Sequence, residues 1–220
     1  MPAFPFDIVA FDLDGTLADT APDIAAAINR MLADFGRAPL AEAEIRPLIG
    51  DGARNLLRKA MAASGPVSEE LLDEAHPRYL EHYAAHICEG TRPYPNLEQA
   101  MDALAALGVR LAVCTNKVTR MTRLLLDALG WTDRFAAIVC GDTLPVFKPD
   151  PATLRETIRL AGGGRCVLVG DSMVDAGTAR AAGTPFVAVS FGFRDRPLEA
   201  LGADAVIDDY AELIPALRRL

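Results

Sequence analysis

The 220-residue chain has only three histidines and four cysteines, and no Cys-x-x-Cys pair occurs among them. Structural zinc sites need such ligands at short spacings, so this kind of site is not expected. The cysteines, Cys88, Cys114, Cys140 and Cys166, lie in dissimilar contexts, and three of them lie in or end apolar runs that are typical of buried strands. We interpret them as reduced core residues of a cytoplasmic protein.

Basic residues are also few, with 22 Lys and Arg against 30 Asp and Glu and a formal net charge of −8. Nucleic acids and anionic membranes bind basic patches, so we expect neither as a partner. No apolar run approaches the roughly 20 residues of a membrane span, and the start of the chain lacks the pattern of a signal peptide. The hydrophobic content of 51% indicates a globular chain with a core.

Short apolar runs alternate with helical patterns over most of the chain. Helices are predicted for 119–129, 151–161, 175–182 and 210–220, and strands for 8–11, 109–114, 137–140, 166–169, 185–189 and 205–207. Strands that are apolar throughout and alternate with helices indicate a parallel sheet covered on both faces. The sequence therefore predicts an α/β fold with a Rossmann-like sheet.

Only helices are predicted between the first two of these strands, at 23–35, 42–48, 53–63 and 68–87. Ile24, Ile28 and Met31 follow the spacing of one buried helix face, and Pro77 is expected to kink or interrupt the last helix. This pattern predicts an α-helical cap domain, residues 20–87, inserted into a core domain of residues 1–19 and 88–220. Linkers with Gly or Pro near 19–22 and 90–95 would join the two.

Polar side chains follow four of the predicted strands. In α/β sheets, ligands bind at the carboxyl ends of the strands, so these side chains are candidates for one site. They are Asp12 and Asp14 after the first strand, Thr115 and Asn116 after the second, Lys148 after the third, and Asp171 and Asp175 after the fourth.

These residue types indicate a particular chemistry. A single Asp most often caps a helix or shapes a turn. Clustered carboxylates without His or Cys, however, favour a hard cation, above all Mg²⁺. A lysine, a hydroxyl group and helix N-termini beside them suit a phosphoryl group. The predicted ligand is therefore a small phosphorylated metabolite bound together with Mg²⁺.

The same residues carry a resemblance to a known family. The segment Asp12-x-Asp14-Gly15-Thr16-Leu17-x-Asp19-Thr20 resembles the first signature of the haloacid dehalogenase (HAD) superfamily. Thr115-Asn116, Lys148-Pro149 and Gly170-Asp171-Ser172-x-x-Asp175 resemble its second, third and fourth signatures. The match spans nearly the whole chain, and the helical insert resembles the cap of the subclass that includes phosphoglycolate phosphatase.

The resemblance implies a role for each residue. Asp12 would be the nucleophile that forms an aspartyl-phosphate, and Asp14 the general acid and base. Mg²⁺ would be held by the Asp12 side chain, the Asp14 main-chain carbonyl and Asp171, and Asp175 would orient bound waters or Lys148. Thr115, the Asn116 backbone N–H and Lys148 would bind the phosphoryl group. An Asp at position 14 argues against the dehalogenase branch, which needs no proton donor there.

Substrate choice is expected to lie in the cap. Its segment 49–57 resembles the cap loop of phosphoglycolate phosphatases, and Phe191-Gly192-Phe193 resembles their Tyr-Gly-Tyr turn. The predicted reaction is hydrolysis of 2-phosphoglycolate, whose carboxylate the Gly52 N–H and Arg54 would hold. A phosphatase for a sugar phosphate or pyrophosphate and a β-phosphoglucomutase-like phosphotransferase remain open. Whether the protein is a monomer or a homodimer also remains open.

Overall fold

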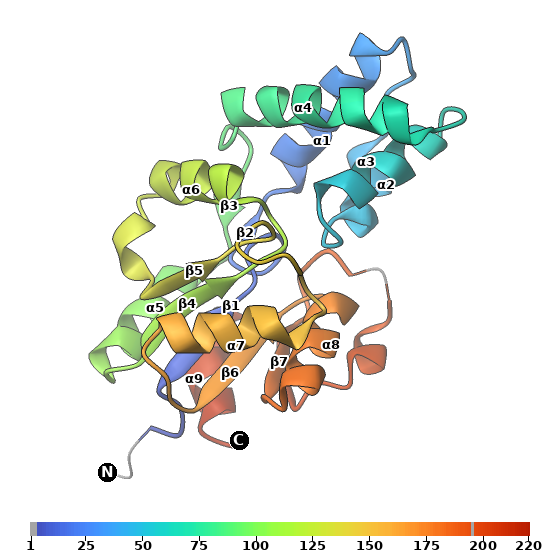
Figure 1. Cartoon of the computed structure of the whole chain (residues 1–220). Coiled ribbons are helices and arrows are strands. Elements are labelled where there is room, and N and C mark those ends of the chain that lie inside the picture. The colour runs from blue at the N-terminus through green and yellow to red at the C-terminus, as the bar shows by residue number, and fades with distance from the viewer. Residues whose placement is uncertain (1–3, 195) are drawn as a thin grey trace.

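A computed structural model describes residues 4–194 and 196–220 and contains a six-stranded parallel sheet (Figure 1). The strand order is β5-β4-β1-β6-β7-β8. β1 pairs with β4 on one side and with β6 on the other, so the strand order reverses next to β1. The strands are β1 (Ile8–Phe11), β4 (Arg110–Cys114), β5 (Ala137–Val139), β6 (Cys166–Gly170), β7 (Phe186–Val189) and β8 (Ala205–Ile207). The predicted α/β fold is confirmed.

Helices cover both faces of the sheet. Alternate residues of the strands pack into two separate clusters: Val9 and Phe11 belong to one, and Ile8 and Ala10 to the other. This is why the strands are apolar throughout rather than alternately polar. The first cluster lies against α5 (Leu97–Ala106), α6 (Thr119–Ala128) and α9 (Leu213–Leu217), and the second against α7 (Pro151–Leu160) and α8 (Met173–Ala182).

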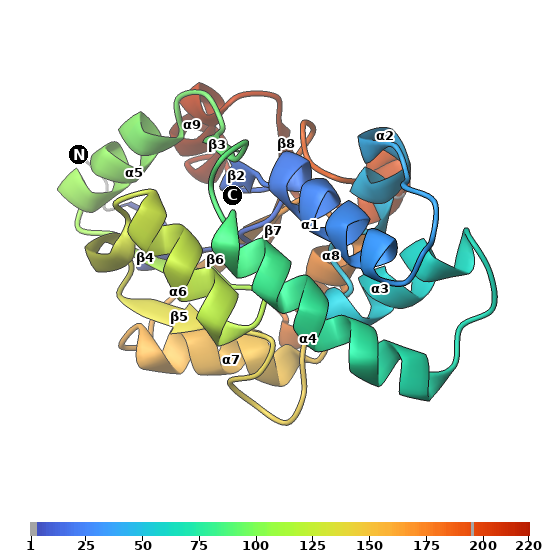
Figure 2. The same ribbon diagram turned by 90° about the horizontal axis from the view of Figure 1, so that it is seen from above.

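The helical insert, residues 20–87, lies beyond the carboxyl ends of the strands (Figures 1 and 2). It contains α1 (Ala21–Asp34), α2 (Glu42–Ile45), a 3₁₀ turn (Arg46–Leu48), α3 (Ala53–Ala62) and α4 (Glu69–Ala85). Ile24, Ile28 and Met31 of α1 are buried in a cluster that these helices largely share. The domain boundaries predicted at 19/20 and 87/88 stay a prediction.

Three local features of the structure differ from the predicted ones. Pro77 does not interrupt helix α4, and because Pro77 is exposed, the carbonyl group that loses its hydrogen bond can face water. The predicted helix 210–220 is a 3₁₀ turn, Tyr210–Glu212, followed by the short α9. Helix α5 was not predicted, although Leu97, Met101 and Leu104 follow helical spacing. Among the described residues, no helix has the length and apolarity needed to cross a membrane.

The two chain segments that join the insert to the sheet domain lie side by side. β2 (Ala18–Asp19) pairs antiparallel with β3 (Arg92–Pro93), and neither strand was predicted. The buried carboxylate of Asp23 accepts hydrogen bonds from the backbone N–H of Gly90 at 2.7 Å, from that of Thr91 at 2.7 Å, and from the Thr91 hydroxyl at 2.6 Å. One side chain at the start of α1 therefore fixes the returning segment.

Replacing this carboxylate tests its contribution to stability. The Asp23→Ala change leaves three donors without their acceptor, and we expect it to lower the free energy of unfolding by about 2–4 kcal/mol. Asp34→Ala is the matched control, because Asp34 is a partly exposed partner of His82, and it should cost less than about 1 kcal/mol. Urea unfolding followed by circular dichroism measures both. Equal effects of the two variants would contradict this role for Asp23.

Candidate active site

The predicted site residues gather where three neighbouring strands end. Asp12, Thr115 and Asp171 directly follow β1, β4 and β6, which are adjacent in the sheet. Asn116 connects the end of β4 to the loop after β5, which contains Lys148. Its side-chain oxygen accepts a hydrogen bond from Lys148 N at 2.8 Å, and its amide nitrogen donates to Lys148 O at 3.0 Å. The Asn116 side chain therefore positions Lys148.

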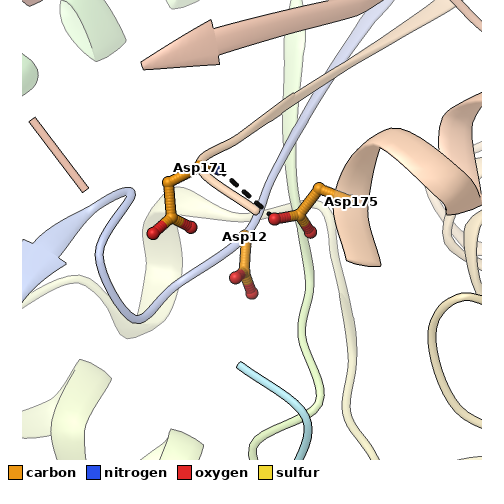
Figure 3. Close-up of side chains that lie close together, drawn as sticks. All are labelled: Asp12, Asp171 and Asp175. Atoms are coloured by element: carbon orange, nitrogen blue, oxygen red, sulfur yellow. Dashed lines mark hydrogen bonds between the residues drawn. The ribbon is translucent and has the colours of Figure 1, made fainter. Parts of the chain in front are cut away.

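Three buried carboxylates lie together beneath this edge. Oxygen atoms of Asp12, Asp171 and Asp175 all lie within 4.8 Å of one another (Figure 3). Asp175 is held by the start of α8, since its Oδ2 accepts from Ser172 N at 3.1 Å, from Ser172 Oγ at 2.6 Å and from Asp171 N at 3.3 Å. The capping of α8 thereby fixes the position of one carboxylate of the cluster.

Lys148 lies between two of these carboxylates. Its Nζ is 2.9 Å from Asp12 Oδ1 and 2.6 Å from Asp175 Oδ1, and the residue is 2% exposed. Burial alone would lower the pKa of Lys148, but Asp12 and Asp175 outweigh it and raise that pKa above its ordinary value. Lys148 therefore remains a cation inside the protein.

The single ammonium group of Lys148 does not balance the negative charge of the three carboxylates in this cluster. Burial raises the pKa of Asp12 to about 6, with further increases from Asp175 and Asp14, although Lys148 opposes the shift. Burial and repulsion by Asp175 and Asp12 raise the pKa of Asp171 well above its ordinary value. Asp12 Oδ1 also receives no well-oriented hydrogen bond, despite its ion pair with Lys148. Buried carboxylate oxygen atoms whose negative charge is not balanced by the protein fit a metal site.

Asp171 is supported from two directions. Its Oδ1 accepts from Thr16 Oγ1 at 3.2 Å, and its Oδ2 accepts from Phe193 N at 2.6 Å. Gly192 lets this turn approach, because a Cβ atom at that position would lie 2.2 Å from Asp171 Cβ. The segment 191–193, which resembles the Tyr-Gly-Tyr turn, therefore supports one of the predicted metal ligands.

Asp14 lies in a different environment from Asp12. Its Oδ1 accepts from Thr20 Oγ1 at 2.7 Å, and Lys117 Nζ lies 2.7 Å from Oδ1 and 2.9 Å from Oδ2. Lys117 also donates to the hydroxyl of Tyr83 in α4 at 2.8 Å. Lys117 was not predicted as a site residue, although its place three residues after the end of β4 was a signal for it.

A cavity of about 40 Å³ opens above Asp12 and Asp14. Gly52 lines it, but Arg54 does not: the Arg54 guanidinium bonds Glu69 at 2.8 Å and Asp73 at 2.7 Å on the surface of the insert. The described residues of its wall are Asp12, Asp14, Ile24, Ile49, Gly50, Gly52, Ala53, Leu56, Tyr79, Leu80, Tyr83, Thr115, Asn116, Lys117, Val118 and Met121. The structure thus brings all predicted site residues together except Arg54.

Comparison with known proteins identifies the framework of this site. A model of the haloacid dehalogenase-like hydrolase family matches residues 6–183, which include all four motifs. The chain belongs to the haloacid dehalogenase-like hydrolase family. The expected family membership of this HAD-like hydrolase is therefore confirmed.

The named relatives of this HAD-like hydrolase are phosphatases. The phosphoglycolate phosphatase of Agrobacterium fabrum is 43% identical over 213 residues, which cover 96% of this chain and 91% of the relative. The phosphoglycolate phosphatase of Mesorhizobium japonicum is 44% identical over 213 residues, which cover 94% and 92%. The crystal structure of a predicted phosphoglycolate phosphatase from Haemophilus somnus is 30% identical with a TM-score of 0.90, and the match covers 96% of this chain and 97% of that one.

The raised pKa of Asp12 in this HAD-like hydrolase has a consequence for stability without metal. Between about pH 4 and pH 6 the folded state binds more protons at Asp12 than the unfolded state does. The free energy of unfolding should therefore fall as the pH rises through this window, by on the order of 2–3 kcal/mol from Asp12. The Asp12→Asn variant lacks this titration.

Urea unfolding at several pH values in the presence of a chelator measures the difference. We expect Asp12→Asn to gain stability relative to the unchanged protein as the pH rises from 4 to 6.5. Parallel pH profiles for the two proteins would contradict the raised pKa.

Proposed function

We propose that this chain is an Mg²⁺-dependent phosphatase that converts 2-phosphoglycolate and water to glycolate and phosphate. The observation that carries the proposal is the pair of carboxylates Asp12 and Asp14 at one small cavity, each with its own lysine. Asp12 is paired with Lys148 among buried carboxylates, whereas Asp14 is paired with Lys117 at the cavity wall. Two carboxylates in different environments suit two different roles in one reaction.

Mg²⁺ is the proposed metal because every available donor is an oxygen atom. The side chains of Asp12 and Asp171 and the main-chain carbonyl of Asp14 would hold it. When bound, the ion would offset the negative charge that these carboxylates and a phosphoryl group bring together. Asp175 would keep Lys148 in place, which its 2.6 Å contact supports.

In the proposed first step, an oxygen of Asp12 attacks phosphorus. A bond forms between Asp12 and phosphorus, the bond from phosphorus to the glycolate oxygen breaks, and an aspartyl-phosphate results. The fixed ammonium of Lys148 stabilises the charge near this oxygen. Thr115 and the backbone N–H of Asn116, which also line the cavity, would bind the phosphoryl oxygens.

Asp14 would handle the protons. In its protonated form Asp14 would donate a proton to the departing glycolate oxygen, and the carboxylate left behind would accept one from the water that attacks phosphorus in the aspartyl-phosphate. Thr20 and Lys117 hold the side chain beside the cavity, and Lys117 stabilises the carboxylate form that acts as the base. The products are glycolate and phosphate, with Asp12 regenerated.

The lining of the cavity favours a short leaving group. Its walls are largely apolar and aromatic, and the only charged side chains among its described lining residues are Asp12, Asp14 and Lys117, which suits glycolate better than a sugar with several hydroxyl groups. A sugar phosphatase, a pyrophosphatase and a β-phosphoglucomutase-like phosphotransferase are the competing activities. Recognition of the carboxylate by Gly52 and Arg54, the cytoplasmic location and the choice between monomer and homodimer stay predictions.

Phosphate release across a panel of phosphorylated metabolites tests this function. We expect 2-phosphoglycolate to give the highest kcat/KM, and Asp12→Asn to lower its kcat by at least about 10⁴-fold, because the amide is no nucleophile. Glucose 1-phosphate converted without phosphate release would instead indicate a mutase. Full activity of Asp12→Asn in a clean preparation would rule out Asp12 as the nucleophile.

Metal removal tests the proposed cofactor. A chelator should abolish phosphate release and excess Mg²⁺ should restore it. Asp171→Asn should raise the Mg²⁺ concentration for half-maximal activity by at least about tenfold, because it removes a charged ligand. Asp102→Asn is the matched control, since Asp102 pairs with Arg134 on the surface. An unchanged Mg²⁺ requirement in Asp171→Asn would exclude Asp171 as a ligand.

A further inference from the structure

The cavity wall offers one positively charged side chain to a negatively charged leaving group. Among the described residues that line it, Lys117 is the only cation. Lys148 does not line the cavity, and its Nζ contacts Asp12 and Asp175. The Arg54 guanidinium is held by two surface carboxylates outside the cavity.

We propose that Lys117 binds the carboxylate of the substrate and so determines specificity for phosphate esters of short hydroxy acids. This inference rests on the proposed function, because it assumes that the phosphoryl group of 2-phosphoglycolate is bound at Asp12. It adds a specificity-determining residue that the four motifs did not point to.

The position of Lys117 relative to Asp14 supports this role. Asp14 would donate its proton to the leaving oxygen, and in 2-phosphoglycolate one carbon atom separates that oxygen from the carboxylate. A cation bonded to Asp14 at 2.7 Å and 2.9 Å therefore lies within reach of the carboxylate. The proximity follows from the covalent structure of the substrate.

The ammonium group of Lys117 is also held in place from the helical insert. Tyr83 accepts its hydrogen bond at 2.8 Å, and the ammonium lies 4.6 Å from the centre of the Tyr83 ring. Tyr79 stacks on Tyr83 with ring centres 5.8 Å apart. Tyr83, which itself packs against Tyr79, thus holds the cation where the insert meets the sheet domain.

The hydrogen bonds of Lys117 allow an exchange with an anionic substrate. Its three ammonium hydrogens are used by the two oxygens of Asp14 and by Tyr83. A substrate carboxylate can replace one of the Asp14 bonds with an equivalent bond. A neutral group at the same place offers a weaker acceptor for a cation that is only 9% exposed.

The test compares two substrates that differ only in this group. They are 2-phosphoglycolate and 2-hydroxyethyl phosphate, in which a hydroxymethyl group replaces the carboxylate. We expect Lys117→Met to lower kcat/KM for 2-phosphoglycolate by about 100-fold, and to lower it for 2-hydroxyethyl phosphate by less than about tenfold. The preference for the carboxylate should therefore fall at least tenfold.

Three further variants make the result specific. Lys117→Gln keeps a polar side chain without charge and should behave like Lys117→Met. Lys59→Met is the matched control, because Lys59 is an exposed lysine paired with Asp51, and it should keep the full preference. Arg54→Ala is the competing variant, since Arg54 is the sequence-predicted partner of the carboxylate. Circular dichroism and thermal melting check that each variant is folded.

The possible outcomes separate this inference from the proposed function. Equal losses for the two substrates in both Lys117 variants would mean that Lys117 only positions Asp14, and would overturn the inference. Loss of the preference in Arg54→Ala with an intact preference in Lys117→Met would overturn it as well. If the unchanged protein prefers a different phosphate ester, the proposed function fails and this inference fails with it.

Discussion

The buried ion pair of Lys148 with Asp12 and Asp175 is the interaction on which the rest of the site depends. A lone buried carboxylate would take up a proton at neutral pH, and a lone buried ammonium would lose one. Together, with distances of 2.9 Å and 2.6 Å, the three groups allow charges to exist inside the protein. A divalent cation would offset the negative charge of the carboxylates that Lys148 alone does not balance.

The sheet places these charges by its strand order. Since β1 lies between β4 and β6, residues distant in sequence follow strands that are hydrogen-bonded neighbours. The helical insert then covers this edge. The Asn116 amide nitrogen, which binds Lys148 O, also donates to Gly50 O of the insert at 3.0 Å. Lys117 makes the second connection, through Tyr83 of α4. Two residues next to each other after β4 thus join the sheet domain, where we propose that the phosphoryl group binds, to the helical insert.

The sequence predicted the sheet and most of the residues that gather at the candidate site because both depend on local patterns. Apolar runs mark the strands. The predicted site residues of the sheet domain lie directly after a strand, in the loop after it or, for Asp175, in the first turn of helix α8. Contacts between residues that are far apart in the chain leave no such local pattern in the sequence. The pairing of β2 with β3 involves only two residues from each segment, and the position of Lys117 depends on Tyr83, 34 positions earlier. The same reason applies to Arg54, whose partners Glu69 and Asp73 become visible only once α3 and α4 pack together.

The most direct test of the central claim is to trap the covalent intermediate. Turnover of 2-phosphoglycolate with Mg²⁺ would be quenched within milliseconds and treated with borohydride, which reduces an acyl phosphate and converts the aspartate that carries it to homoserine. Mass spectrometry of the digested protein locates the change. The account predicts homoserine at position 12, formed only when substrate is present. Reduction at Asp14 or Asp171, or no reduced residue during rapid turnover, would contradict it.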